Sequence, residues 1–231
     1  MVSKLVLKHD VAFKTVFGSD DEKNQIVLCS LLYALLGKKV KFVQITDNRF
    51  IDNSKSCVNL VAQLQSGRKV IVELEIVNPR EDIMYEMMLD LYAIYGNQEL
   101  KGDELDLGLK SSYKIGIADF VVDPDFEGLL TEFDLRNKKG QPLGRDLEII
   151  VLKIIQLVKV PVMDPDQMSL LQKWCFFIKY YADDKKQDII QELIRLEEGI
   201  AMADKIINRM DSKVIEKLNK DYFKNIETCK M

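Results

Sequence analysis

Two alternating apolar runs separated by a short polar turn constrain the fold more than any other feature of this sequence. Apolar side chains occupy every second position of residues 57–65, and again of residues 69–77. Because successive side chains of a strand point to opposite faces, each run predicts a strand with one apolar face. The turn Ser66-Gly67-Arg68 is typical of a hairpin connection. The apolar face would consist of Val58, Leu60, Ala62, Leu64, Val70, Val72, Leu74 and Ile76.

Helical and strand-like patterns surround this hairpin in a mixed order. Gly18 and Gly37 stand where two helices are expected to end, and Asp10 is expected to cap the first of them. The apolar spacing then switches between periods typical of helices and of strands. The expected elements are helices over residues 10–17, 22–36 and 81–100, and strands over residues 40–46, 113–122, 130–135 and 147–158.

A proline-containing break, Val160-Pro161 to Pro165, separates this region from a purely helical one. Residues 166–225 carry three or four helical patterns with charged outer faces, and Trp174 is expected to be a packing residue there. We therefore expect an α/β core over residues 1–160, with an added strand pair, and a helical C-terminal extension over residues 161–231.

The composition excludes several classes of protein. The chain has 231 residues, 47% hydrophobic and 30% charged, so it can bury a substantial core and is not disordered. It has no run of about 18 apolar residues and no signal-peptide pattern, so we expect a cytoplasmic protein without a membrane partner. A net charge of −4 argues against a strongly cationic nucleic-acid binder, but not against an enzyme that grips phosphate with a local basic patch.

The cysteines and the single histidine argue against two further kinds of site. Because no C-x-x-C pair occurs, a zinc site is disfavoured and buried thiols in a reducing compartment are favoured. With His9 as the only histidine, mechanisms built on a Ser-His or Cys-His pair are weakened too. The cysteines are Cys29, Cys57, Cys175 and Cys229.

Polar side chains are expected on the face of the hairpin opposite its apolar one. Glu73 and Glu75 are two positions apart, so they point the same way and lie about 7 Å apart. A connecting loop of three or five residues would place Asn59 across from Glu73 or Glu75 on that face. A two-residue loop would place it on the other face instead.

Two carboxylates and a carboxamide on one sheet face could hold a hard divalent cation through oxygen ligands. Mg²⁺ (or Mn²⁺) at such a site would activate water and offset charge on a phosphodiester. The alternative is a hairpin with a wet outer face, since acidic residues at alternating strand positions are common. The spacing alone leaves both interpretations open.

Several short motifs resemble those of a known family. Residues 10–18 follow the form D-x-x-F-K-x-x-F-G, which resembles the opening motif of the recombination-promoting nuclease / putative transposase family. That family belongs to the PD-(D/E)XK nuclease superfamily. Residues 58–75 are similar to its hairpin pattern and residues 95–102 to its Y-x-x-Q-x-x-x-G stretch. Residues 147–153, 173–178 and 198–201 also look familial, so the similarity covers nearly the whole chain.

This resemblance implies a fold and an activity. The fold is α/β, with a restriction-endonuclease-like αβββαβ core, a mixed central sheet and a helical C-terminal extension. The activity is Mg²⁺-dependent (or Mn²⁺-dependent) DNA endonuclease chemistry, linked to recombination or mobile elements in a bacterial cytoplasm. Glu73 would be the principal metal ligand, with Asn59 and Glu75 assisting. A homodimer would supply the two active centres that a double-strand break needs, whereas a relative without activity could pair with an active paralogue.

The motif at the start of the chain has two interpretations. The resemblance implies that its helix borders the DNA groove and that Lys14 meets a phosphate. The local alternative is that Asp10 caps the helix and forms a surface ion pair with Lys14, worth roughly 0.2–0.5 kcal/mol.

Departures from the family pattern fall on the site itself. Asn59 stands where the family has a metal-binding aspartate, Glu75 where it has glutamine, and Glu86 where it has arginine. The second hypothesis is therefore a catalytically degenerate relative that acts as a DNA-binding or protein-interaction module. A third is an unrelated structural α/β protein.

Overall fold

The computed structural model of the 231-residue chain describes residues 4–19, 22–46, 57–98, 110–141 and 150–228. By its contacts the chain divides into two compact units. Residues 41–158 form one, the sheet unit, and residues 1–40 with 159–231 form the other, the helical unit. The predicted division into a core over residues 1–160 and an extension over residues 161–231 stays a prediction.

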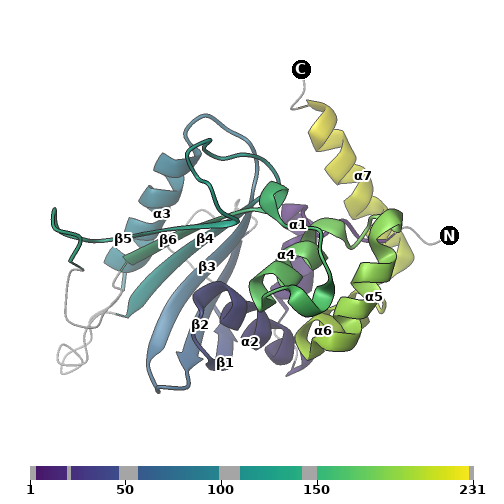
Figure 1. Cartoon of the computed structure of the whole chain (residues 1–231), viewed down its shortest axis with the longest axis horizontal. Helices are drawn as coiled ribbons and strands as arrows, with labels where there is room; N and C mark the ends of the chain where they lie inside the picture. Colours follow the sequence, from purple (N-terminus) through teal and green to yellow (C-terminus); the bar gives the residue numbers. More distant parts are fainter. Residues whose placement is uncertain (1–3, 20–21, 47–56, 99–109, 142–149, 229–231) are drawn as a thin grey trace. The chain divides into compact units, whose positions relative to one another are not determined.

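A six-stranded sheet forms the framework of the sheet unit (Figure 1). Its order is β1-β2-β3-β4-β6-β5. The β2–β3 and β5–β6 pairs are antiparallel, and the β3–β4 and β4–β6 pairs are parallel, so the sheet is mixed as predicted. The strands are β1 (Val40–Ile45), β2 (Cys57–Leu64), β3 (Lys69–Val77), β4 (Ser111–Ala118), β5 (Leu130–Asp134) and β6 (Ile150–Gln156).

The β2–β3 hairpin turns through a three-residue loop. Leu64 N–H donates to the carbonyl oxygen of Arg68 at 2.8 Å, and Gly67 takes a φ of 85°, a left-handed conformation that suits glycine. This loop places Asn59 directly opposite Glu73. Of the two registers left open by the sequence, the structure therefore has the one that puts Asn59 and the glutamates on the same face.

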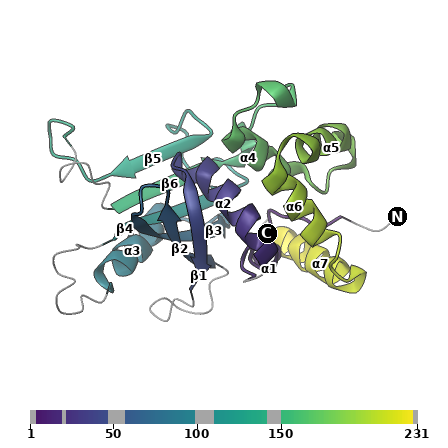
Figure 2. The same ribbon diagram turned by 90° about the horizontal axis from the view of Figure 1, so that it is seen from below.

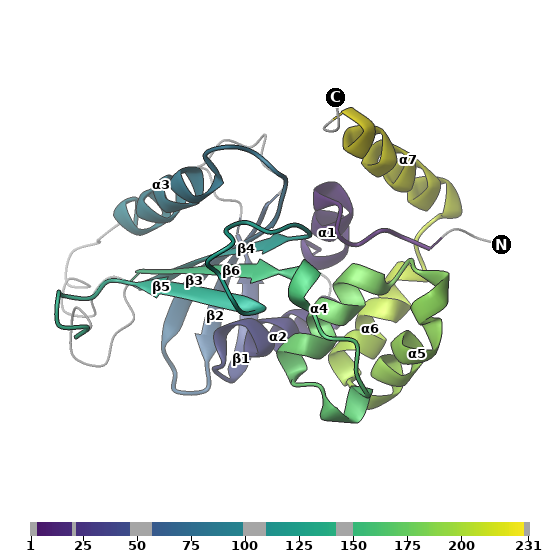
Figure 3. The same ribbon diagram turned by 45° about the horizontal axis from the view of Figure 1, so that its top comes forward.

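Helix α3 (Ile83–Gly96) lies over that face of the sheet (Figure 3). Its buried Met87 and Leu91 belong to one apolar cluster with Leu152 of β6. Gly116 of β4 lets the helix come close, because a Cβ there would lie 2.5 Å from Met87 Cε and 2.8 Å from Val77 Cγ2. The absence of a side chain at Gly116 thus sets how near α3 sits to β3 and β4.

The added strand pair is present at one edge of the sheet. Figure 2 shows β5 beside β6, and their antiparallel register pairs Leu130 with Ile155 and Asp134 with Val151. Lys153 of β6 forms an ion pair with Glu132 of β5 at 2.7 Å. The pair is the one predicted from the sequence, although residues 142–149 lie outside the described part of the chain.

The helical unit is built around buried aromatic side chains. Trp174 contacts the rings of Phe17 and Phe177 edge to face, and its Nε1–H donates to Ser30 Oγ at 3.1 Å. Trp174 is fully buried, which confirms its predicted packing role. The α-helices are α1 (Asp10–Phe17), α2 (Glu22–Leu36), α4 (Leu170–Tyr180), α5 (Gln187–Leu196), α6 (Glu198–Ile207) and α7 (Ser212–Thr228), with short 3-10 turns at Leu157–Lys159, Pro165–Gln167 and Asp184–Lys186.

Among the described residues, none of these helices is both long and apolar enough to cross a membrane. The helical C-terminal region and the mixed sheet agree with the predicted α/β class.

Candidate metal centre

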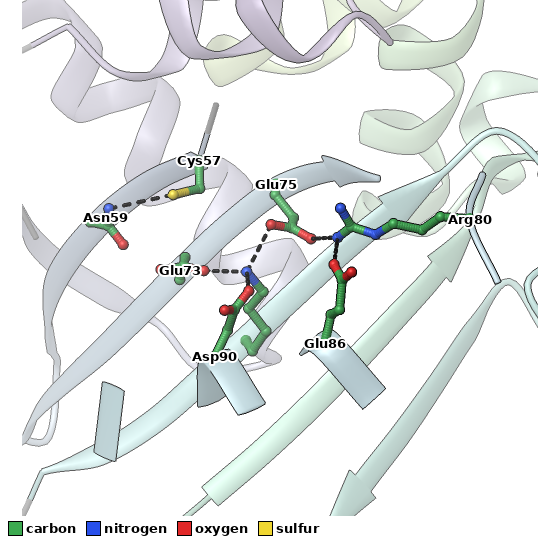
Figure 4. A network of polar contacts seen from close by, with 8 residues as sticks. Cys57, Asn59, Glu73, Glu75, Arg80, Glu86 and Asp90 are labelled. Carbon is green, nitrogen blue, oxygen red and sulfur yellow. Dashed lines mark hydrogen bonds and ion pairs between the residues drawn. The ribbon is translucent and has the colours of Figure 1, made fainter. Parts of the chain in front are cut away.

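The glutamates of β3 are buried beneath a helix and are not exposed to solvent. Glu73 and Glu75 both point to the side of the sheet that α3 covers, and both are buried. The interpretation of this face as a solvated outer surface is therefore wrong, because a helix packs over it. Asp90 of α3 reaches the same place, and one carboxylate oxygen from each of the three residues lies within 4.8 Å of the others. Figure 4 shows the three side chains together, and we call them the acidic cluster.

A lysine from the next strand occupies the centre of the acidic cluster. Lys114 of β4 lies beside Glu73 in the parallel register, and its side chain is fully buried. Its Nζ forms an ion pair with Glu73 Oε1 and lies 2.8 Å from Glu75 Oε2 and 3.3 Å from Asp90 Oδ2. A single ammonium therefore donates to all three carboxylates.

The charges of the cluster shift the pKa values of its members. Burial by itself would lower the pKa of Lys114, but the charges of Glu73 and Glu75 and the hydrogen bonds to them outweigh burial and raise it. Burial also raises the pKa of Glu73; attraction to Lys114 reduces this rise without cancelling it, and the neighbouring carboxylates add to it. Lys114 thus stays protonated at neutral pH, beside carboxylates that it does not fully neutralise.

Two oxygens of the acidic cluster remain without a hydrogen bond from any residue that the structure describes. These are Glu73 Oε2 and Glu75 Oε1, and both are buried. A buried acceptor without a hydrogen bond costs about 1–3 kcal/mol. For Glu75 Oε1 the charge of Arg80, whose Nη2 lies 3.8 Å away, offsets part of that cost. Carboxylate oxygens are the ligands that Mg²⁺ and Mn²⁺ prefer, so the chemistry of this donor set fits a divalent ion.

Arg80 brings a second positive charge to the edge of the acidic cluster. Its Nη2 lies 3.8 Å from Glu75 Oε1 and 2.9 Å from Glu86 Oε2. Glu86 is the residue that the sequence resemblance predicts to stand where the family pattern has arginine. A guanidinium still comes near the cluster here, but from the segment that precedes α3, and Glu86 holds it by an ion pair (Figure 4).

Asn59 lies opposite Glu73, but its amide contacts a cysteine. Its Nδ2–H₂ donates to Cys57 Sγ at 3.6 Å, and Figure 4 shows the amide directed at Cys57. Burial raises the pKa of the Cys57 thiol, and the charge of Glu73 raises it further, which keeps Cys57 neutral. The role of Asn59 as a metal ligand stays a prediction.

The two DNA-binding residues predicted at the start of the chain belong to the helical unit. Asp10 is the first residue of α1 and His9 is its N-cap, so the prediction that Asp10 caps this helix is wrong. The Asp10 carboxylate instead accepts from Val11 N–H at 2.7 Å and lies 3.2 Å from His9 Nε2. Lys14 is exposed, and its contact with a phosphate stays a prediction.

Sequence reasoning missed Asp90 and Lys114. Both carried a usable signal, because a charged residue is rarely found fully buried unless it is paired. Lys114 is the only charged residue of β4, in which every position is buried. Asp90 lies three residues after Met87, on the side of α3 that faces the sheet. A charged residue inside an apolar strand, or on the apolar face of a helix, indicates one half of a buried ion pair.

The comparisons with known proteins gave one match. A family model described as PD-(D/E)XK nuclease family transposase matches residues 7–226, a range that includes both β3 and β4 and the helix between them. Neither the curated proteins nor the solved structures gave a match.

Proposed function

Because this chain belongs to the PD-(D/E)XK nuclease family transposases, we propose that it is a metal-dependent DNA endonuclease that acts in recombination or on mobile elements. The observation that carries the proposal is the convergence of Glu73, Glu75 and Asp90 from a strand and a helix. Three carboxylates this close carry more negative charge than the single ammonium of Lys114 offsets, and such an excess of charge in a largely buried group is typical of functional sites.

The residues of the cluster have separate roles in this proposal. Glu73 and Glu75 would hold the divalent ion, with Asp90 completing the set from α3. The ion, Mg²⁺ or Mn²⁺, would activate water and offset negative charge on the phosphodiester. Arg80 is about one-third exposed beside Glu75, so it would be the group that meets the DNA backbone at the edge of the site.

Plasmid cleavage tests the proposal. Purified protein is incubated with supercoiled plasmid and Mg²⁺ or Mn²⁺, beside Glu73→Gln and a matched control, Glu132→Gln. Glu132 belongs to β5 and pairs with Lys153, so its loss removes a carboxylate of the same sheet outside the acidic cluster. We expect cleavage by the natural protein and by Glu132→Gln, and loss of cleavage in Glu73→Gln. An intact plasmid in every sample would overturn the proposal.

A second candidate is a catalytically degenerate relative that binds DNA or another protein. Two observations favour it: the amide of Asn59 is directed at Cys57, and Lys114 already fills the cluster. Asn59→Asp restores the charge that the family pattern carries. If this variant cuts plasmid and the natural protein only retards DNA in a gel, the natural protein is a catalytically degenerate relative that binds DNA. Equal cleavage by both would contradict it.

A further inference from the structure

We propose that the ammonium of Lys114 is the resident cation of the acidic cluster, and that a divalent ion binds there only by displacing it. The inference rests on the proposed metal-binding role of the cluster, and it identifies Lys114 as the residue that sets the affinity of the site for metal. The inference follows from the carboxylate oxygens that converge in the cluster and from the ammonium on which they converge.

The convergent oxygens of the acidic cluster already accept hydrogen bonds. Glu73 Oε1, Glu75 Oε2 and Asp90 Oδ2 all accept from Lys114 Nζ. A divalent ion needs carboxylate oxygens at about 2.0–2.6 Å, so an ion bound by these same atoms would take the place of the ammonium. The ion and Nζ cannot both occupy that point.

The two oxygens without a hydrogen bond do not offer a second convergent position. Glu75 Oε1 is directed at Arg80, with which it forms an ion pair at 3.8 Å from Nη2 (Figure 4). A positive charge on that side repels a further cation. Glu73 Oε2 is the remaining unpaired oxygen of the pair. The point on which oxygens of all three carboxylates converge is therefore the one that Lys114 Nζ holds.

Displacement is opposed by the burial of Lys114. Its side chain is fully buried, and its ammonium donates to three carboxylates at once. Moving the ammonium away breaks three charge-assisted hydrogen bonds, which a divalent ion must replace. The natural protein should consequently bind divalent ions weakly, and a neutral side chain of similar shape at position 114 should open the site.

Calorimetric titration with Mn²⁺ alone, in the absence of DNA, tests this. The samples are the natural protein, Lys114→Met and a matched control, Lys153→Met. Lys153 is also a buried lysine of the sheet, but it pairs with Glu132 and lies on the face opposite Lys114. We expect Lys114→Met to bind Mn²⁺ at least about tenfold more tightly than the natural protein, since one competing charge is gone, and Lys153→Met to bind as the natural protein does. Equal affinity in Lys114→Met and the natural protein, or binding by neither, would overturn the inference.

A second measurement follows Lys114 in the natural protein, which avoids dependence on the folding of the variant. Amine acetylation read by mass spectrometry should leave Lys114 unmodified without metal and modify it once Mn²⁺ is bound, while modification of Lys153 stays constant. Bound Mn²⁺ with Lys114 still protected would contradict displacement. If Lys114→Met is unfolded without metal, recovery of its circular dichroism by Mn²⁺ supports the inference, and no recovery counts against it.

The failure of this inference and that of the proposed function are distinguishable. Both measurements use no DNA, so displacement of Lys114 can be observed although plasmid stays intact. Conversely, if plasmid is cleaved while Lys114 stays protected from acetylation at all metal concentrations, the nuclease proposal is supported and the displacement of Lys114 is rejected.

Discussion

Glu73 and Lys114 lie directly opposite each other on adjacent parallel strands, and their side chains form a fully buried ion pair. The two residues are 41 positions apart in the chain. Glu75 and Asp90 share the same ammonium, so the pair is the centre of a larger charged group. This arrangement governs both the stability of the sheet unit and the access of a metal ion to its carboxylates.

Removal of the ammonium should strongly destabilise the fold in the absence of metal. Lys114→Met leaves buried carboxylates without their counter-charge, and breaking a buried ion pair in this way typically costs about 3–5 kcal/mol. Urea unfolding at neutral pH measures the loss. Lys153→Met should cost less, because its partner Glu132 is more than one-third exposed. An equal loss in both variants would contradict the special position of Lys114.

The raised pKa of Glu73 predicts a pH dependence of stability. A carboxyl whose pKa is higher in the folded than in the unfolded chain stabilises the fold below its unfolded value, near 4.5, and loses that contribution as pH rises through the folded value. Glu73→Gln does not titrate. The free energy of unfolding of the natural protein should therefore fall relative to that of Glu73→Gln as pH rises above 4.5.

Urea unfolding of both proteins at a series of pH values on either side of 4.5 measures the difference, and Glu192→Gln supplies a control of opposite sign, whose difference from the natural protein changes below pH 4.5. The Arg195 hydrogen bond lowers the pKa of Glu192, so its contribution is present above the unfolded value and is lost as pH falls. A constant difference between the natural protein and Glu73→Gln would refute the predicted titration.

Gly116 should tolerate no larger residue, since it sets the distance between α3 and the sheet. In Gly116→Val the added atoms would meet Met87 and Val77, and overpacking of this kind costs about 1–3 kcal/mol. The shift of α3 should also carry Asp90 away from Lys114. Gly96→Ala is the control, because a Cβ at this last residue of α3 meets nothing within 4 Å. Thermal unfolding should show a lower midpoint for Gly116→Val alone.

Asp90 should contribute to metal binding, although it belongs to no sequence motif of the predicted site. Loss of one ligand charge in Asp90→Asn is expected to weaken Mn²⁺ binding, and with it plasmid cleavage, by at least about tenfold. Asp82→Asn changes an exposed aspartate at the N-cap of the same helix, whose side chain makes no capping hydrogen bond, and should behave as the natural protein. Equal cleavage by the two variants would remove Asp90 from the ligand set.

Much of the framework was predictable because it depends on local patterns. The strands that became β2 and β3 were predicted from their alternation, and Gly67 marks the turn between them. The face carrying Glu73 and Glu75 follows from the same alternation. The capping role of Asp10 was predicted wrongly, since helix ends are decided by one or two residues and His9 takes the N-cap position.

The local sequence thus fixed the direction in which Glu73 and Glu75 point, because side-chain direction in a strand depends only on the position along it. It did not decide what they meet. Asp90 and Lys114 come from segments distant in the chain, and their approach depends on the packing of α3 over Gly116 and on the parallel pairing of β3 with β4. Such contacts arise from the folded arrangement, and they convert a possible wet sheet face into a buried carboxylate group that already contains its own cation.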